Sequence, residues 1–298
     1  MSEGFVDGVD VSWDEARATN LANWNDRVDI HVRGYGIEAF TDPSHLSQVV
    51  RTDLAVLERI LPDGVRGLDV CHLQCHIGTD TVSLARAGAA SVVGVDFSAP
   101  ALAAARDLAE ASGVRAEWVE TDVLDARAAV SRTLGEERMF DLVYTSIGTI
   151  TWLQDLDTWG RQVAALLKPG GTFYIRDAHP MLYVFDDAAD GLVVKHRYFP
   201  NGLAEQWEEE TSYVGEGQVA HSRTFEYPHS LAEIFGSLLG AGLQVVAFEE
   251  GRTLPWQYSP VMTAREDGDY ELPAPLDQSV PLTFTLAARK PHEEPARP

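Results

Sequence analysis

Basic side chains are scarce in this sequence of 298 residues. Lys and Arg total 23 against 46 Asp and Glu, which gives a formal net charge of -23. Such a surface repels phosphate groups, so nucleic acids and anionic membranes are poor partners for it. No run of 18 apolar residues occurs, so no segment is expected to span a membrane.

Cysteine occurs only at Cys71 and Cys75, which excludes a disulfide framework and fits a reducing cytoplasm. The N-terminus has neither a basic segment nor an apolar run, so we expect no secretory signal there. The composition is 45% hydrophobic and 23% charged, as in ordinary globular domains. A soluble cytoplasmic α/β protein is therefore expected.

Hydrophobic periodicity predicts helices over residues 13–35 and 46–61, followed by alternating strands and helices. The predicted strands are 67–75, 91–98, 114–122, 140–148 and 172–179, and the predicted helices between them are 76–88, 99–113 and 158–171. This alternation indicates a parallel sheet covered by helices on both faces, a Rossmann-like doubly wound α/β fold.

Residues 181–229 interrupt this alternation with three aromatic-rich, β-like runs at 192–199, 205–214 and 218–227. A helix and a strand resume over 229–250, and a last β-like run covers 281–290. We therefore predict one structural domain. It has an N-terminal helical cap (1–62), a core (63–290) with an inserted flap (181–229), and a polar tail (291–298).

Ligands of doubly wound sheets bind beyond the carboxyl ends of the strands. Asp96 ends the second predicted strand, where a carboxylate can accept hydrogen bonds from both hydroxyls of a ribose. The alternative is an acid at the helix N-terminus before Ser98. Asp122 can accept from an adenine amino group, with Val123 and Phe97 packing on the ring, and the alternative is a loop-capping aspartate.

The segment HLQCHIG, residues 72–78, has one glycine where a dinucleotide fingerprint requires three. Side chains at Gln74 and His76 should obstruct a pyrophosphate, which argues against NAD or FAD, whereas a nucleoside without phosphates is tolerated better. Cys71 to His76 also holds two Cys and two His. Strand alternation separates Cys71 from His72, so we expect a packed strand and no metal.

These positions together resemble the class I S-adenosylmethionine-dependent methyltransferases. The chain resembles bacterial small-molecule enzymes whose first motif reads HLQCHxG in place of DxGCGxG. The resemblance covers nearly the whole chain, in the segments WNDRVDIH (24–31), LQCHIGTDTVSLAR (73–86), GVDFS (94–98), FDLVYTSIG (140–148), LLKPGGTFYIRDAHP (166–180) and HSLAEIFGSLLGAGL (229–243). It implies a seven-stranded sheet of order 3-2-1-4-5-7-6 with the seventh strand antiparallel.

The resemblance implies S-adenosyl-L-methionine as cofactor and assigns residues to it. His72 stands where the family has a carboxylate that addresses the methionine amino group, and it forfeits the charge attraction. The other implied cofactor residues are Gln74 and Gly78 at the methionine part, Asp96, Phe97, Asp122 and Val123 at the nucleoside, Ser146 and Ile147 beside the sulfonium, and Tyr35 or Arg33 closing over the methionine.

His179, after the fifth strand, is the expected general base because an imidazole titrates near neutral pH. The alternative is a histidine hydrogen-bonded to backbone at a strand exit; His76 and Asp177 are weaker candidates. The aromatic side chains expected to wall the acceptor pocket, unless they pack in the core and flap, are Trp152, Tyr183, Trp207 and Tyr258.

After the fourth strand the chain reads TSIG, residues 145–148, and lacks the [DN]PP[YFW] motif of enzymes that methylate bases or glutamine. We therefore expect methyl transfer to N or O of a small metabolite or natural product, with a homodimer as one arrangement. One rival is an enzyme of the same fold that transfers the aminocarboxypropyl group or cyclises the cofactor. Others are a non-catalytic binding module and, disfavoured by the missing glycines, an NAD-dependent oxidoreductase.

Overall fold

A seven-stranded sheet forms the centre of the computed structural model, which describes residues 5–135, 137–212, 214 and 217–292. Its order is β4-β3-β2-β5-β6-β13-β9, and β13 runs antiparallel to both β6 and β9. The strands are β2 (Asp69–Leu73), β3 (Ser91–Asp96), β4 (Glu117–Glu120), β5 (Phe140–Thr145), β6 (Leu167–Ala178), β9 (Gln244–Gly251) and β13 (Thr283–Arg289). The predicted fold class and strand order are confirmed.

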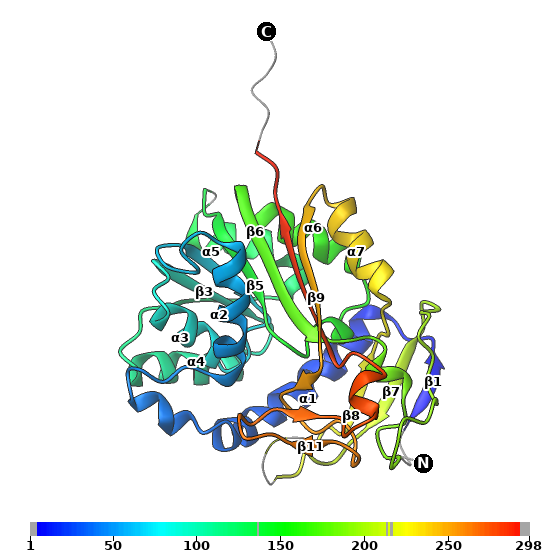
Figure 1. Ribbon diagram of the computed structural model, residues 1–298. Coiled ribbons are helices and arrows are strands. Elements are labelled where there is room, and N and C mark those ends of the chain that lie inside the picture. The colour runs from blue at the N-terminus through cyan, green and yellow to red at the C-terminus, as the bar shows by residue number, and fades with distance from the viewer. Residues whose placement is uncertain (1–4, 136, 213, 215–216, 293–298) are drawn as a thin grey trace.

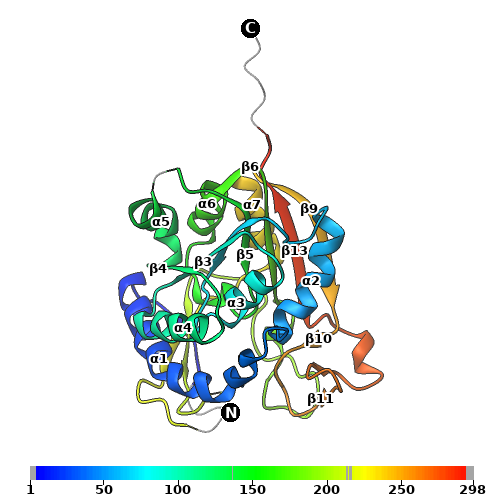
Figure 2. The same ribbon diagram turned by 90° about the vertical axis from the view of Figure 1, so that its left-hand side faces the viewer.

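Helices cover both faces of this sheet (Figures 1 and 2). The helices are α2 (Gln48–Ile60), α3 (Thr79–Arg86), α4 (Ala99–Ala111), α5 (Ala126–Leu134), α6 (Leu156–Leu166) and α7 (Leu231–Gly240). One apolar core contains Trp159 of α6 and Leu238 of α7, and the other contains Leu57 of α2 and Leu84 of α3. The sheet is therefore buried on both sides, as its apolar strands require.

The predicted helix 158–171 ends early, at Leu166, and the residues after it open β6. Pro169 lacks the N–H that a continuing helix needs. Gly170 has φ 81°, and its amide donates to the carbonyl of Lys290 at 2.9 Å. The LKPGG segment thus extends the strand.

A second sheet joins the N-terminus to the predicted flap. It has the order β1-β7-β8, made of β1 (Val6–Val9), β7 (Ala204–Glu208) and β8 (Arg223–Glu226). The sequence did not predict β1, and the predicted run 192–199 is not a strand: within it only Val194 pairs, as an isolated bridge with Phe185. The domain division remains a prediction, and most of its tail, 293–298, lies outside the described residues.

The N-terminal helix α1 (Trp13–Gly34) and the small sheets lie below the lower end of the large sheet in Figure 1. Asn20 fixes α1 to β8, since its side chain donates to the carbonyl of Phe225 and accepts from its amide, both at 2.8 Å. A third sheet, unpredicted, consists of β10 (Thr253–Leu254), β12 (Tyr270–Glu271) and β11 (Thr263–Ala264). None of the described helices has the length and apolar character needed to cross a membrane.

Candidate functional site

A cavity of ≈ 1010 Å³ lies where the carboxyl ends of β2 to β5 meet α1 and the flap. This volume is at the upper end of the range for small-molecule sites. Most of the predicted site residues line it: Tyr35, Gln74, Asp96, Phe97, Asp122, Val123, Ser146, Ile147, Trp152, Tyr183, Trp207 and Tyr258. The cavity's lining does not include His72, Gly78, His179 or the exposed Arg33.

The loop after β2 has the backbone of a glycine-rich turn although two of its positions carry large side chains. Gln74 and His76 have φ of 54° and 48°, and Gly78 has 78°. The left-handed region is strained for residues with a Cβ, so the surrounding contacts must hold it. The Gln74 amide donates to the carbonyl of Thr149 at 3.1 Å, and Nε2 of His76 lies 2.8 Å from Nδ1 of His31.

Those two histidines join the cap to the loop. Burial lowers the pKa of His31 to about 4 and that of His76 to about 3, so both rings are neutral at pH 7. His31 also bonds Ser212 of the flap at 2.9 Å, and its ring stacks on Tyr35 at 4.9 Å. A neutral pair at this position is a structural link, which leaves His76 a poor base.

Asp96 holds this loop and faces the cavity. Its Oδ2 accepts from the amide of His76 at 2.8 Å and its Oδ1 from the amide of Ser98 at 2.9 Å. Burial raises its pKa to about 6 against these hydrogen bonds. The backbone of Phe97 is a third donor to this carboxylate. A carboxylate has about four acceptor sites, so acceptor capacity remains for a ligand. Both interpretations of Asp96, ribose acceptor and helix N-terminal acid, are compatible with these contacts.

Asp122 likewise combines two roles. Its Oδ1 caps the following turn by accepting from the amide of Leu124 at 2.9 Å, as the loop-capping alternative requires. Its Oδ2 lies 2.7 Å from Nε of Arg17 on α1, a partner that the sequence analysis missed. Both Arg17 and Asp122 line the cavity, so the cap contributes to this end of the site.

His72 is buried behind the cavity wall. Its Nδ1 lies 2.8 Å from Oγ1 of Thr81 and its Nε2 lies 3.1 Å from Oγ of Ser146, and burial lowers its pKa to about 3. A neutral ring with both nitrogens engaged orients Ser146. A carboxylate does line the cavity nearby: Asp80, at the start of α3, is hydrogen-bonded by Ser47 and Ser146. Burial raises its pKa to about 6.

Gly78 serves packing. A Cβ at this position would lie 2.7 Å from the ring of Trp118 and 2.8 Å from Cβ of Ala105. Any larger residue would therefore displace α4 or β4. Both cysteines of the CHLQCH segment are buried free thiols, and within the described residues no group of three or more His, Cys, Asp or Glu is placed to hold a metal.

His179 does not line the cavity. Its Nδ1 accepts from the amide of Met181 at 3.0 Å, and its Nε2 lies 3.2 Å from Oε1 of Glu250 on β9. Burial lowers its pKa, partly offset by Glu250. The arrangement is that of a histidine bonded at a strand exit. Asp177 is equally engaged, since its two oxygens accept from the amides of residues 148, 149, 150 and 178.

Two glutamates of the flap line the cavity and escaped the sequence analysis. Glu205 of β7 and Glu226 of β8 are directly opposite each other in the antiparallel pair. Burial raises the pKa of Glu205 to about 7 and that of Glu226 to about 8. Strand alternation already places Glu205 with Trp207 on one face, but the register with β8 is not encoded locally.

Residues 70–171 match the family model described as a methyltransferase domain. The chain has the Rossmann-like methyltransferase fold. Its structure is similar to that of 1,6-didemethyltoxoflavin-N1-methyltransferase from Burkholderia thailandensis, solved with 1,6-didemethyltoxoflavin and S-adenosylhomocysteine. The TM-score is 0.55 at 17% identity, over 96% of this chain and 93% of that one. A putative S-adenosylmethionine-dependent methyltransferase from Listeria monocytogenes gives a TM-score of 0.51 at 18% identity, over 81% of this chain and 99% of that one.

In sequence, the chain is similar to a ubiquinone biosynthesis O-methyltransferase from Chelativorans sp. (strain BNC1). The two are 28% identical over 165 residues, which is 53% of this chain and 61% of that protein. The matched part thus spans less than two thirds of the relative's length. These similarities support the fold and the methyltransferase domain. The substrate and the roles of individual residues have to be argued from the residues that line the cavity.

Proposed function

We propose that this protein is an S-adenosylmethionine-dependent methyltransferase that modifies N or O of a small molecule. The observation that carries the proposal is the cavity beyond β2 to β5, which gathers the nucleoside-type residues Asp96, Phe97, Asp122 and Val123 on a methyltransferase fold. Its size leaves room for a cofactor and a small acceptor together.

In the part of the cavity that we assign to the cofactor, Asp96 accepts hydrogen bonds from the ribose hydroxyls and Asp122 accepts one from the adenine amino group. Phe97 and Val123 pack on the adenine ring. The residues fit such a ligand, because Asp96 keeps free acceptor sites and Oε1 of Gln74 is buried without a hydrogen-bond partner among the described residues. Ser146 and Ile147 flank the sulfonium.

The methionine part needs a carboxylate for its amino group. His72 supplies none, and we assign this role to Asp80, which lines the cavity beside Ser146. His72 then acts as a positioning residue that orients the Ser146 hydroxyl. Tyr35 lines the same cavity from the end of α1 and closes over this part, whereas Arg33 is exposed outside it.

When bound, S-adenosylmethionine supplies a methyl group already activated on a sulfonium. The protein's own contribution is to hold the acceptor in line with sulfur and to keep water out. Trp24 and Trp152 wall this region with ring centroids 5.3 Å apart, and Nε1 of Trp152 donates to the carbonyl of Gly148 at 2.9 Å. A base at His179 is not retained, because His179 does not line the cavity and its two ring nitrogens lie against Met181 and Glu250.

The test is isothermal titration calorimetry with S-adenosylhomocysteine and, separately, with NAD. Micromolar binding of S-adenosylhomocysteine and no binding of NAD support the proposal, and the reverse pattern rejects it. Turnover of S-adenosylmethionine with an acceptor panel then separates the chemistries. S-adenosylhomocysteine as product means methyl transfer, methylthioadenosine means attack on another carbon, and binding without turnover favours a binding module. The acidic surface and the two free, buried thiols fit a cytoplasmic enzyme acting on small molecules.

A further inference from the structure

The inner face of the small sheet forms the wall of the cavity opposite the large sheet. Glu205 and Trp207 of β7 and Thr224 and Glu226 of β8 all line the cavity. They alternate with outward residues such as Glu208, which is exposed and pairs with Arg223. The register places Glu205 opposite Glu226 and Trp207 opposite Thr224. Two carboxylates and an indole are therefore presented together on one face.

This pair is unfavourable in the protein alone. Like charges directly opposite each other in a sheet are destabilising. Glu205 is 7% exposed, and its carboxylate has neither a hydrogen bond nor an ion pair with any described residue, although the charge of Arg197 acts on it. Glu226 accepts one hydrogen bond, from the hydroxyl of Thr151 at 3.2 Å. A buried carboxylate without a partner costs free energy, so the pair favours a bound cation or a proton.

The nearby guanidiniums are already engaged by other groups. Nη2 of Arg27 lies 3.5 Å from Glu209, and its Nε donates to Asn23 at 2.7 Å. Arg197 is ion-paired with Asp7. The charges of these guanidiniums lower the pKa of Glu205 and Glu226, but burial still raises both, and no ion pair joins either guanidinium to the two carboxylates among the described residues. A cation from outside the chain would complete the neutralisation of the pair.

The remaining walls suit a cation attached to an apolar or aromatic body. The aromatic side chains that line the same cavity include Trp24, Trp152, Trp207, Trp256 and Tyr258. Aromatic faces attract ammonium groups as well as apolar surface. Nε1 of Trp207 is buried and has no acceptor among the described residues, so one further hydrogen bond remains for a ligand. Thr151, the partner of Glu226, follows directly on the loop that holds Ser146 and Ile147.

We propose that the acceptor is a basic amine with an aromatic or apolar body, held as an ammonium by Glu205 and Glu226. This inference rests on the proposed function and names its substrate class. The ammonium gives one proton to one of the two glutamates, which frees the nitrogen lone pair. The lone pair forms the N–C bond to the methyl carbon while the electrons of the C–S bond return to sulfur. The products are the methylated ammonium and S-adenosylhomocysteine.

Matched probes test this assignment. Phenethylamine, tryptamine and their N-methyl derivatives are each compared with the amide and the carboxylic acid that most closely match their skeleton. Binding is followed by ligand-observed NMR and by thermal shift, with S-adenosylhomocysteine present. We expect at least one amine to bind about tenfold more tightly than its matched amide and acid.

Three variants assign the preference to residues. Glu205→Gln and Glu226→Gln should each lower the affinity for the amine about tenfold and leave that for S-adenosylhomocysteine unchanged. Glu208→Gln makes the same change on the outer face of the same strand and should alter neither affinity. Circular dichroism checks that each variant folds. If Glu226→Gln does not fold, the affinities of Glu205→Gln alone decide the test.

Several outcomes would overturn the assignment while leaving the proposed function intact. The first is that the acids or amides bind more tightly than the amines. The second is that Glu205→Gln and Glu226→Gln both leave the affinity for the amine unchanged. The third is that protein that binds S-adenosylhomocysteine binds no amine at millimolar concentration. Selective loss of S-adenosylmethionine relative to S-adenosylhomocysteine binding, with amine binding intact, would assign the pair to the sulfonium. If S-adenosylhomocysteine itself does not bind, the proposed function fails, and the same amine comparison is made without it.

Discussion

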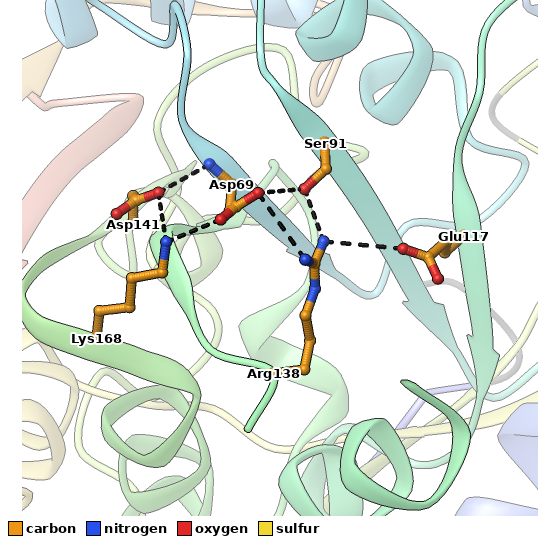
Figure 3. A network of polar contacts seen from close by, with 6 residues as sticks. All are labelled: Asp69, Ser91, Glu117, Arg138, Asp141 and Lys168. Carbon is orange, nitrogen blue, oxygen red and sulfur yellow. Dashed lines mark hydrogen bonds and ion pairs between the residues drawn. The ribbon is translucent and has the colours of Figure 1, made fainter. Parts of the chain in front are cut away.

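At the amino ends of the parallel strands, acidic side chains meet basic ones within the chain. Nζ of Lys168 donates to Asp69 at 2.8 Å and to Asp141 at 2.9 Å, and Asp69 also accepts from Ser91 at 2.6 Å. Hydrogen bonds from Lys168 and Ser91 lower the pKa of Asp69. Figure 3 shows the whole network, which comprises Asp69, Ser91, Glu117, Arg138, Asp141 and Lys168.

At the opposite end of the same sheet, several carboxylates that line the cavity have raised pKa values. Burial raises the pKa of Asp80 and Asp96 to about 6, that of Glu205 to about 7 and that of Glu226 to about 8. Amides and hydroxyls donate the hydrogen bonds that Asp80, Asp96 and Glu226 accept. Charges at the amino end are neutralised in the folded chain, whereas those at the cavity gain most from a ligand. Perturbed carboxylates collected in a cavity indicate a functional site.

The largest expected effect is that of Asp96→Ala on cofactor binding. Two hydrogen bonds from ribose to a charged group contribute about 1.5–3 kcal/mol each, and about 1.4 kcal/mol corresponds to tenfold in affinity. The affinity for S-adenosylhomocysteine should fall at least ~100-fold by calorimetry. Asp107→Ala, an exposed aspartate on α4, is the matched control. Equal affinities in both variants would leave Asp96 with only its loop contacts to His76 and Ser98.

The next effect separates the methionine part from the nucleoside. Asp80→Asn removes the charge that we assign to the methionine amino group, so the affinity for S-adenosylhomocysteine should fall about tenfold. Adenosine lacks that amino group, and its affinity should be unchanged. Both constants come from the same calorimetric series. A parallel loss of adenosine binding would mean that Asp80 acts by shaping the loop through Ser47 and Ser146.

The difference between the two ends also shows what the sequence encodes. Asp96 and Asp122 were predicted because each lies at the carboxyl end of a strand, and strand ends of one parallel sheet meet at one edge. The side chains of Gln74 and His76 were expected to obstruct a pyrophosphate. The backbone of this loop nevertheless adopts the left-handed conformation of glycine, held by contacts to Thr149 and His31 that are distant in sequence.

Glu205 and Glu226 were missed for a similar reason. Strand periodicity gives the alternation in each flap strand, but pairing with β1 and α1 decides which face meets the cavity. His179 was placed at the crevice because it follows a strand. The chain turns there, and the imidazole is directed to Met181 and Glu250. Side-chain direction after a strand depends on tertiary contacts, which a local pattern does not contain.

A smaller effect concerns stability and pH at the cavity. The pKa of Glu226 rises from 4.5 to about 8 on folding, through burial and the charges of Glu209 and Glu205, offset by Thr151 and Arg27. The native state thus keeps a proton that the unfolded chain has lost, and the free energy of unfolding falls as pH rises through this window. Glu226→Gln does not titrate. Its Tm should exceed that of the wild type at pH 8 and approach it at pH 5, and parallel curves would contradict the raised pKa.

The smallest effect is expected at the amino end, from Lys168→Met. Its side chain is 36% exposed, so the ion pairs contribute about 1 kcal/mol or less. That corresponds to ~2–4 °C in Tm for a large domain. The affinity for S-adenosylhomocysteine should be unchanged, because the network lies at the opposite end of the sheet.

The pH dependence should also be opposite in sign to that at Glu226. Because the pKa of Asp69 is lowered on folding, its ionised carboxylate stabilises the fold at pH values above 3.8, the ordinary pKa of an aspartate. This contribution is lost as the pH falls through the native pKa of Asp69. The Tm difference between wild type and Lys168→Met should therefore be constant from pH 5 to pH 8 and shrink in acid. A difference that grew with rising pH would place a buried, uncompensated carboxylate at this end as well and remove the contrast.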